Sequence, residues 1–261
     1  MSEQALCIKT NNLSMQFGGQ IAVNQVSCSF VSNSVNAIIG PNGAGKSTLL
    51  NLMSGQLFPT WGEVYFNNTD ITAKSPAIRT RLGIGRAFQK TNLFPNLTAH
   101  ENIRLAVQMR TGIGRNFWSS SSKFKEISEK AEDYLKQVSL DYKRDSIAGT
   151  LSHGQQRRLE IGVLMALEPK VYILDEPTNG MSLEEVPEIL DLITKIHADE
   201  EKIVILVEHK MDFVKKVADR VIVMHNGNLI GDGTFEQVMN APQVQGAYLG
   251  VVPDAGVRFV E

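Results

Sequence analysis

The sequence predicts an α/β fold with a helical lobe inserted into it. Three runs are apolar and β-branched almost throughout: VNAIIG at 35–40, VYILDE at 171–176 and IVILVEH at 203–209. Continuous runs of this kind are typical of parallel strands that are buried on both faces. Helical patterns follow these runs, and residues 99–160 have mostly helical patterns of their own. Strands that alternate with helices favour the α/β class.

Further elements extend this core towards both ends of the chain. Residues 5–10 and 22–31 alternate loosely between apolar and polar side chains, which indicates antiparallel strands. LEEVPEILDLITKIHADEE at 183–201 predicts a helix. RVIVMHNGNLIGDG at 220–233 predicts a hairpin whose turn is Asn226-Gly227, because this pair accepts the positive φ angles of a two-residue turn.

The helical middle suggests how the chain is organised. We expect one α/β lobe from residues 1–98 and 161–250, and a helical lobe from residues 99–160. Within the helical lobe, WSSSSK at 118–123 predicts a loop because it is polar and rich in serine. Residues 251–261 are expected to form an irregular tail.

Composition excludes several classes of protein. The chain has 43% apolar and 21% charged residues, as in ordinary globular proteins, and its net charge of -2 indicates no nucleic-acid partner. Cys7 and Cys28 are the only cysteines, and they form neither a zinc motif nor a disulfide framework. No signal peptide and no apolar run near the ~18 residues of a membrane span is visible. If the protein acts at a membrane, another chain must supply the spans.

A phosphate-binding loop lies between the first apolar run and the helical pattern KSTLLNLMSG at 46–55. GPNGAGKS matches the pattern G-x-x-x-x-G-K-[ST] in the strand–loop–helix context that this loop requires. Lys46 is expected to reach the β- and γ-phosphates, and Ser47 to hold Mg²⁺. A glycine-rich turn that ends in Lys-Ser by chance is the alternative, and the context argues against it. The residues expected to contact the nucleotide here are Gly40, Pro41, Asn42, Gly43, Ala44, Gly45, Lys46, Ser47 and Thr48.

Two carboxylates end the second apolar run. Asp175 stands where α/β sheets bind ligands, and its carboxylate suits Mg²⁺. We expect Glu176 to point away from Asp175 along the strand pleat and to polarise an attacking water molecule. A solvated acidic turn is the alternative, which is poor for this pair beside a phosphate loop. No NKxD sequence follows, so a GTPase is not indicated.

These motifs, in this order, resemble the ATP-binding subunit of an ABC transporter, as a single domain over about residues 6–250. GPNGAGKS corresponds to Walker A and VYILDE to Walker B. Gln89 in GIGRAFQK, LSHGQ at 151–155 and His209 in VEHKMDF fall at the family's Q-loop, signature and switch histidine. The resemblance implies a P-loop NTPase cassette with a RecA-like α/β lobe, an antiparallel β subdomain and an inserted helical lobe.

The resemblance also implies cofactors, partners and further roles. ATP and Mg²⁺ are the expected cofactors. Phe17 would stack on adenine, with a core position as its alternative. Gln89 would touch Mg²⁺ or water, and His209 the γ-phosphate. Two cassettes would pack head to tail, as a homodimer or a heterodimer. They would bind two membrane permease subunits at the cytoplasmic face of the inner membrane, and a solute-binding protein would complete the system.

The branch of the family is indicated by longer stretches. QFGGQIAVNQVS, LSHGQQRRLEIG and the ending AYLG look like ATPases of branched-chain amino-acid importers. GIGRAFQK, LSHGQ and EPTNGMS look most like the urea or short-chain amide importers within that group. A lipopolysaccharide-export ATPase and a soluble ABC protein without a transport role are the alternatives. Ser182 stands where a common family pattern has aspartate, so contacts of that aspartate cannot be assigned to it.

LSHGQ departs from the usual signature by His153 in place of a glycine. Ser152 and Gln155 form a capping box, so one interpretation is only a well-started helix. A capped helix N-terminus also presents free N–H groups to an anion. By resemblance, Ser152 and Gly154 contact the γ-phosphate held by the opposite subunit, and Gln155 belongs to the same site. We interpret His153 as a marker of the branch, and a pH-sensing role as the lesser alternative.

Overall fold

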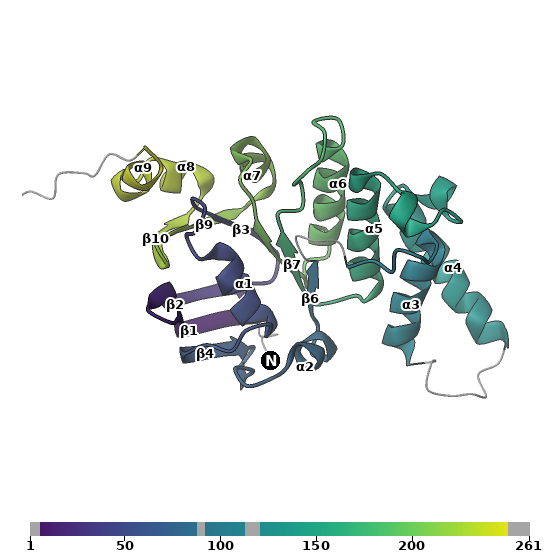
Figure 1. Ribbon diagram of the computed structural model, residues 1–261, viewed down its shortest axis with the longest axis horizontal. Helices are drawn as coiled ribbons and strands as arrows, with labels where there is room; N and C mark the ends of the chain where they lie inside the picture. Colours follow the sequence, from purple (N-terminus) through teal and green to yellow (C-terminus); the bar gives the residue numbers. More distant parts are fainter. Residues whose placement is uncertain (1–5, 88–91, 113–120, 250–261) are drawn as a thin grey trace, which may run out of the picture.

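The computed structural model describes residues 6–87, 92–112 and 121–249, which form two sheets and a set of helices (Figure 1). Among these residues, the larger sheet has six strands in the order β10-β9-β3-β8-β7-β6. All its pairings are parallel except that of the β9–β10 hairpin. The bounds are β3 (Ser34–Ile39), β6 (Ile84–Ala87), β7 (Val171–Asp175), β8 (Ile203–Val207), β9 (Arg220–His225) and β10 (Asn228–Gly233).

A smaller antiparallel sheet has the order β2-β1-β4-β5. Its strands are β1 (Cys7–Phe17), β2 (Gln20–Val31), β4 (Trp61–Phe66) and β5 (Thr69–Asp70). The antiparallel pair predicted near the N-terminus is therefore confirmed, but both strands are longer than expected. Asn12 and Gln25 have positive φ angles of 46° and 50° at irregularities in the ladder, and these irregularities interrupt the alternation that marks a strand.

The helices occupy two places relative to the sheets. In Figure 1, α3, α4 and α5 lie together at one end of the molecule, and α1 packs against strands of both sheets. The α-helices are α1 (Lys46–Ser54), α2 (Pro76–Arg81), α3 (Ala99–Thr111), α4 (Ser121–Gln137), α5 (His153–Ala166), α6 (Val186–His197), α7 (Met211–Val217), α8 (Phe235–Met239) and α9 (Pro242–Leu249). Two 3-10 turns, η2 (Asp141–Lys143) and η3 (Ala148–Thr150), link α4 to α5.

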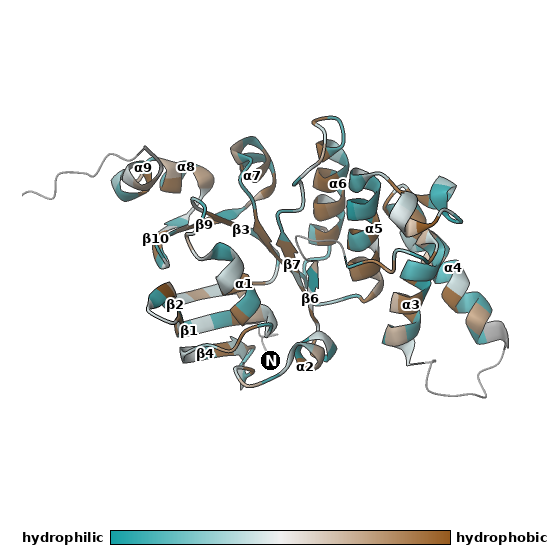
Figure 2. Ribbon diagram, viewed as in Figure 1, coloured by the Kyte–Doolittle hydropathy of each residue, from teal (hydrophilic) through white to brown (hydrophobic). Residues whose placement is uncertain are grey.

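Both faces of the six-stranded sheet are buried along β3, β7 and β8. Ala37 and Ile39 of β3 belong to the hydrophobic cluster that includes α3, α5 and α6, whereas Ile38 belongs to the cluster with α1 and the small sheet. Because successive side chains of a strand point to opposite faces, the continuous apolar runs are explained by this double burial. Figure 2 shows the apolar colour along β7, which lies between β8 and β6 in the sheet.

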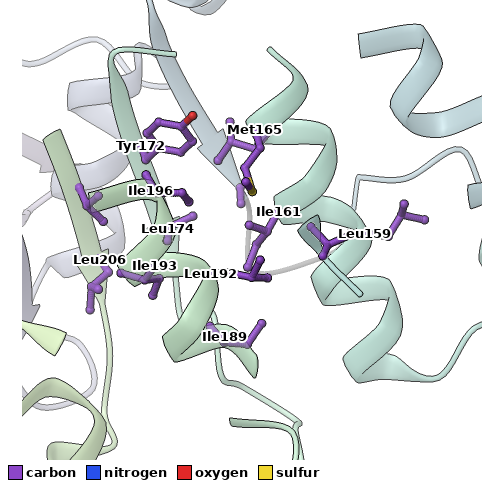
Figure 3. Packing of buried hydrophobic residues seen from close by; sticks show 14 of the residues in the cluster. Leu159, Ile161, Met165, Tyr172, Leu174, Ile189, Leu192, Ile193, Ile196 and Leu206 are labelled. Carbon is purple, nitrogen blue, oxygen red and sulfur yellow. The ribbon is translucent and has the colours of Figure 1, made fainter. Parts of the chain in front are cut away.

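Helix α6 joins the sheet to the helical part of the molecule. Its buried side chains recur with helical spacing along one face, and they are Ile189, Leu192, Ile193 and Ile196. Figure 3 shows this face near Ile161 and Met165 of α5, and near Leu174 and Leu206 of the sheet. The apolar layer therefore runs without interruption from β7 and β8 through α6 to α5.

One helix prediction and one loop prediction are corrected in their bounds. The helix expected over 183–201 begins only at Val186, with proline in its first turn, and ends at His197. The polar segment 118–123 is not wholly a loop, because Ser121–Lys123 begin α4, whose buried Ile127, Ala131 and Leu135 recur every fourth residue. Residues 118–120 lie outside the described residues.

Other predictions about the organisation of the chain have different outcomes. The hairpin turn is confirmed: Asn226 and Gly227 both have positive φ, 47° and 79°. The division into lobes stays a prediction, and the boundary at residue 160 falls inside α5. The tail at 251–261 lies outside the described residues. Sequence reasoning missed β4, β5, β6 and α2, which are short or weakly patterned.

Candidate active site

The phosphate loop connects β3 to α1 in a conformation that only glycine permits at two positions. Gly45 has a φ of 98°, and a β-carbon built on it would lie 2.2 Å from the carbonyl oxygen of Ala22. A β-carbon on Gly40 would lie 2.1 Å from the carbonyl oxygen of Met224. The loop is thus pressed against the backbone of β2 and β9, and any side chain at these positions would displace it.

The phosphate loop leads directly into the N-terminus of α1. Gly45 is the N-cap residue, and no side chain caps the helix. The Lys46 ammonium is largely buried and donates to the carbonyl oxygens of Gly40 at 2.8 Å and Pro41 at 2.9 Å. Burial lowers the pKa of Lys46, and the nearby carboxylates of Glu176 and Asp175 oppose this shift. Helix N–H groups and a held ammonium together suit a phosphate.

A cavity of about 330 Å³ lies beside the loop, within the size range of small-ligand pockets. It gathers most of the residues predicted for nucleotide binding. Phe17 is 47% exposed at its edge, so the alternative of a core position for Phe17 is excluded. Gln20 and Ala22, which sequence reasoning missed, also line it because β2 starts there. The predicted residues that line it are Phe17, Asn42, Gly43, Ala44, Gly45, Lys46, Ser47, Thr48, Glu176 and His209.

Asp175 is buried at the end of β7. Its Oδ2 accepts a hydrogen bond from Arg86 of β6 at 3.0 Å, and Arg86 also donates to Asn51 and Ser54 of α1. Asp175 Oδ1 is buried and has no hydrogen-bond partner among the described residues. A buried carboxylate oxygen without a donor fits a metal ligand. Mg²⁺ commonly takes one or two carboxylates together with substrate phosphates, so Asp175 with the Ser47 hydroxyl fits that ion.

Glu176 leaves the strand in a left-handed backbone conformation with a φ of 50°. The prediction that the strand pleat directs the two carboxylates apart is therefore wrong, because β7 ends at Asp175 and Glu176 lies outside the pleat. Glu176 Oε1 lies 2.8 Å from His209 Nε2, and Glu176 Oε2 accepts from Asn179 at 2.8 Å. The carboxylate is thus held from two sides at the cavity.

His209 follows β8 and is positioned by its neighbour Glu208. The Glu208 carboxylate is buried and accepts from the backbone N–H of His209 at 3.0 Å and of Thr178 at 2.8 Å. It therefore ties the turn after β7 to the turn after β8. No pattern in the sequence distinguishes this glutamate from an ordinary polar residue at a strand end.

The signature residues stand at the start of α5, outside this cavity. Ser152 and Gln155 form the predicted capping box, with both of its hydrogen bonds present. Gly154 is buried against Glu185, whose Oε1 would lie 2.2 Å from a β-carbon built on that glycine. His153 is exposed, and its ring lies beside Gly180. Gln89 lies outside the described residues.

The described residues contain neither a membrane-spanning helix nor a cluster of metal-ligating side chains. None of their helices is long and apolar enough to cross a membrane. They also contain no group of three or more histidine, cysteine, aspartate or glutamate side chains that could hold a metal ion by themselves.

Comparison with known proteins agrees with this geometry. The family model described as "ABC transporter" matches residues 23–179. The chain is 36% identical to the high-affinity branched-chain amino acid transport ATP-binding protein BraF of Pseudomonas aeruginosa, over 93% of this chain and 97% of that protein.

Solved structures give the same picture. The ADP conformation of MJ1267, an ATP-binding cassette of an ABC transporter, has a TM-score of 0.80 and 32% identity, and the match covers 95% of this chain and 100% of that one. The cassette MJ0796, solved as a dimer bound to ADP and phosphate, has a TM-score of 0.76 and 28% identity over 87% of this chain and 98% of that one. This chain therefore belongs to the ABC transporter family and has the cassette fold of its ATP-hydrolysing subunits.

Proposed function

We propose that this chain drives the import of a small polar solute by hydrolysing ATP, and that branched-chain amino acids are its leading candidate cargo. The similarity to BraF over nearly the whole of both chains supports this cargo class. The observation that carries the hydrolytic role is the contact of Glu176 with His209 at the cavity beside the phosphate loop. A base within hydrogen-bond reach of a phosphate site is what hydrolysis requires.

The cavity divides into an adenine side and a phosphate side. Phe17 offers an exposed ring for stacking at one edge. Lys46 and the N–H groups of α1 would hold the β- and γ-phosphates, while the carbonyl oxygens of Gly40 and Pro41 hold the lysine in place. Ser47, Asp175 and Gln89 are the proposed magnesium ligands. When bound, Mg²⁺ neutralises charge on the phosphates.

Glu176 is the proposed catalytic residue. Its carboxylate would accept a hydrogen bond from the attacking water and orient it towards the γ-phosphate. His209 would contact the same phosphate, and this is supported by its position in the cavity lining and by its contact with Glu176 Oε1. Asn179 holds the second oxygen, which leaves the carboxylate with a defined direction.

A second cassette would complete the site. Ser152, Gly154 and Gln155 are candidate nucleotide contacts, yet they stand outside the cavity formed by this chain. A head-to-tail dimer, with either an identical or a different cassette, would bring these residues of one chain to the γ-phosphate held by the other. The dimeric structure of MJ0796 supports such an assembly.

An open groove of about 860 Å³ supports the proposal of permease partners. It lies between α2, the end of α3 and the turn after α5, and its lining includes the apolar side chains of Leu82, Met109 and Leu167. We infer that an apolar segment of a permease docks here, one for each cassette. The groove lies between the predicted α/β lobe, residues 1–98 and 161–250, and the predicted helical lobe, residues 99–160. The chain would then act as a peripheral subunit at the cytoplasmic face of the membrane.

Urea or short-chain amides are the second candidate cargo. The observation that favours them is the LSHGQ signature with its exposed His153, together with GIGRAFQK and EPTNGMS. In either case a solute-binding protein would deliver the cargo to the permeases.

Solute uptake in a strain that lacks this chain tests the proposal. Branched-chain amino acids, urea and acetamide are supplied in parallel, and the strain is complemented with the unmodified chain or with Glu176→Gln. We expect uptake of one class to return only with the unmodified chain. Return of branched-chain amino-acid uptake supports the leading cargo, and return of urea or acetamide uptake supports the second. Unchanged uptake of all three would contradict both.

A further inference from the structure

A buried arginine links the signature helix to the backbone of the candidate catalytic residue. Arg157 of α5 is 2% exposed. Its guanidinium donates to the carbonyl oxygens of Asp175 at 2.5 Å, Glu176 at 3.0 Å and Pro177 at 3.3 Å. One side chain therefore contacts three consecutive carbonyl oxygens at the point where the chain leaves β7.

The carboxylate that balances this arginine comes from the same helix. Glu160 is 5% exposed, and its Oε2 lies 2.6 Å from Arg157 Nη1. Glu160 Oε1 also accepts, at 3.4 Å, from the backbone N–H of Asn92. A buried ion pair of this kind tolerates little movement, because separating the partners would leave a charge unpaired in the interior.

The backbone that Arg157 contacts has an unfavourable conformation at Glu176. Glu176 has a φ of 50°, which is unfavourable for a residue with a side chain. Such conformations persist where the surroundings fix them from several sides. Here the backbone N–H of Glu176 donates to the carbonyl oxygen of Val207 at 2.9 Å. Arg157 binds the carbonyl oxygen of Asp175, just before Glu176, and that of Glu176 itself. The direction of the Glu176 carboxylate depends on these contacts.

Arg157 is also close to the end of α5 that carries the signature. It lies about one helical turn after Ser152 and Gly154, on a helix whose start is fixed by the capping box. A displacement of this N-terminus would therefore move the guanidinium, and with it the three carbonyl oxygens. The fork of arginine can hold several acceptors in fixed directions, which lysine cannot do.

We propose that Arg157 is a positioning residue that transmits the state of the signature end of α5 to Glu176. The inference rests on the proposed function, in which the signature of this chain meets the nucleotide of a second cassette while Glu176 acts on the nucleotide of its own. When the signature of this chain engages the ATP of the second cassette, Arg157 would thereby fix the direction of the Glu176 carboxylate at this chain's own ATP site. Hydrolysis at the two sites is then linked through a side chain within one subunit.

The neighbouring arginine provides a matched control. Arg158 is also largely buried on α5, but it pairs with Glu188 and approaches the carbonyl oxygens of Val138 and Ser139. Among the described residues, its hydrogen bonds and its ion pair do not involve the turn after β7. Arg158→Lys therefore tests the general cost of replacing a buried arginine of this helix, without loosening Glu176.

The experiment measures phosphate release by the full chain as a function of ATP concentration. We expect Arg157→Lys to lower kcat by about ten- to a hundredfold, the cost of losing charged hydrogen bonds, while half-saturating ATP stays near its original value. Arg158→Lys should keep kcat close to that of the unmodified chain. Glu176→Gln with Arg157→Lys should still form an ATP-bound dimer, because binding does not need the carboxylate in place.

A double-mutant cycle tests whether Arg157 transmits the state of the α5 N-terminus to Glu176 or only stabilises the turn at Glu176. If Arg157 passes on the state of the α5 N-terminus, Ser152→Ala should reduce kcat less in the Arg157→Lys background than in the unmodified chain. Multiplicative effects of the two changes would overturn the proposal, as would equal losses in Arg157→Lys and Arg158→Lys, or an unmodified kcat in Arg157→Lys.

A second variant covers poor folding of the first. If thermal unfolding shows that Arg157→Lys does not fold, Glu160→Gln keeps a hydrogen-bond acceptor for Arg157 but removes its charge partner. It should lower kcat with little change in half-saturating ATP, and unmodified turnover would overturn the inference. Failure of the proposed function gives a different result, since Glu176→Gln alone would then hydrolyse ATP normally.

Discussion

Helices α1 and α5 both begin at candidate phosphate contacts, yet their N-termini are built differently. α1 starts after Gly45, which has a φ of 98° and provides no side-chain cap. α5 starts after Ser152, whose hydroxyl accepts from the N–H of Gln155 while the Gln155 side chain accepts from the N–H of Ser152. The first end leaves its N–H groups to a ligand within the same chain. At the second end, side chains already bind the N–H groups of Ser152 and Gln155, which is consistent with the proposal that this end meets a nucleotide only across a dimer.

Giving α1 the cap of α5 should have the largest effect. In Gly45→Ser the new side chain would collide with the Ala22 carbonyl, so the loop must move and ATP binding should be lost in calorimetry. Gly18→Ser is the matched control, because Gly18 also has a positive φ but lies outside the cavity lining, and a β-carbon there meets nothing within 4 Å. Equal ATP affinity in the two variants would show that the close approach of the loop to β2 is unimportant.

Removing the charge at the start of α1 should have the next largest effect. Lys46→Ala loses the charge-assisted hydrogen bonds proposed for the β- and γ-phosphates, so ATP affinity should fall by about ten- to a hundredfold. Isothermal calorimetry measures this directly. Undiminished binding would contradict the role assigned to the phosphate loop.

Removing the cap of α5 should leave nucleotide binding by the single chain intact. Ser152→Ala is expected to cost about 0.5–2 kcal/mol of stability and to reduce ATP hydrolysis through the dimer. Thr234→Ala removes an equivalent capping box from α8, so it should show a similar loss in thermal unfolding and no loss of hydrolysis. If the two variants hydrolyse ATP equally well, the cap of α5 serves the helix alone.

The unusual residue in the signature should matter least. His153 is exposed, so His153→Gly should change ATPase activity by no more than about twofold. We also expect its pH profile to follow that of the unmodified chain across the range in which imidazole titrates. A profile that changes in the variant would instead favour the pH-sensing role.

The start of α1 was the more predictable of the two regions. The phosphate loop, the strand before it and the helix after it are contiguous in sequence, and local pattern was enough to place them. The capping box of α5 is local in the same way. Phe17 could be proposed only by resemblance, because its place at the cavity edge depends on how the small sheet packs against the phosphate loop.

Residues whose contacts are distant in sequence could not be found. Arg157 is an ordinary basic residue on a helix until the fold brings β7 beside it. Arg86 and Glu208 are likewise explained only by their tertiary partners. The backbone of Glu176 was predicted wrongly, since no local signal distinguishes a pleated end from a left-handed turn at that position.

The most direct test of the account is the behaviour of Glu176→Gln in ATP. The neutral amide keeps the shape of the side chain but cannot act as a base, so phosphate release should fall by about 10²–10⁴-fold. Sedimentation in ATP should show a stable dimer that retains the nucleotide. Phosphate release at the unmodified rate, or a variant that binds ATP only as a monomer, would contradict a catalytic carboxylate acting within a shared ATP site.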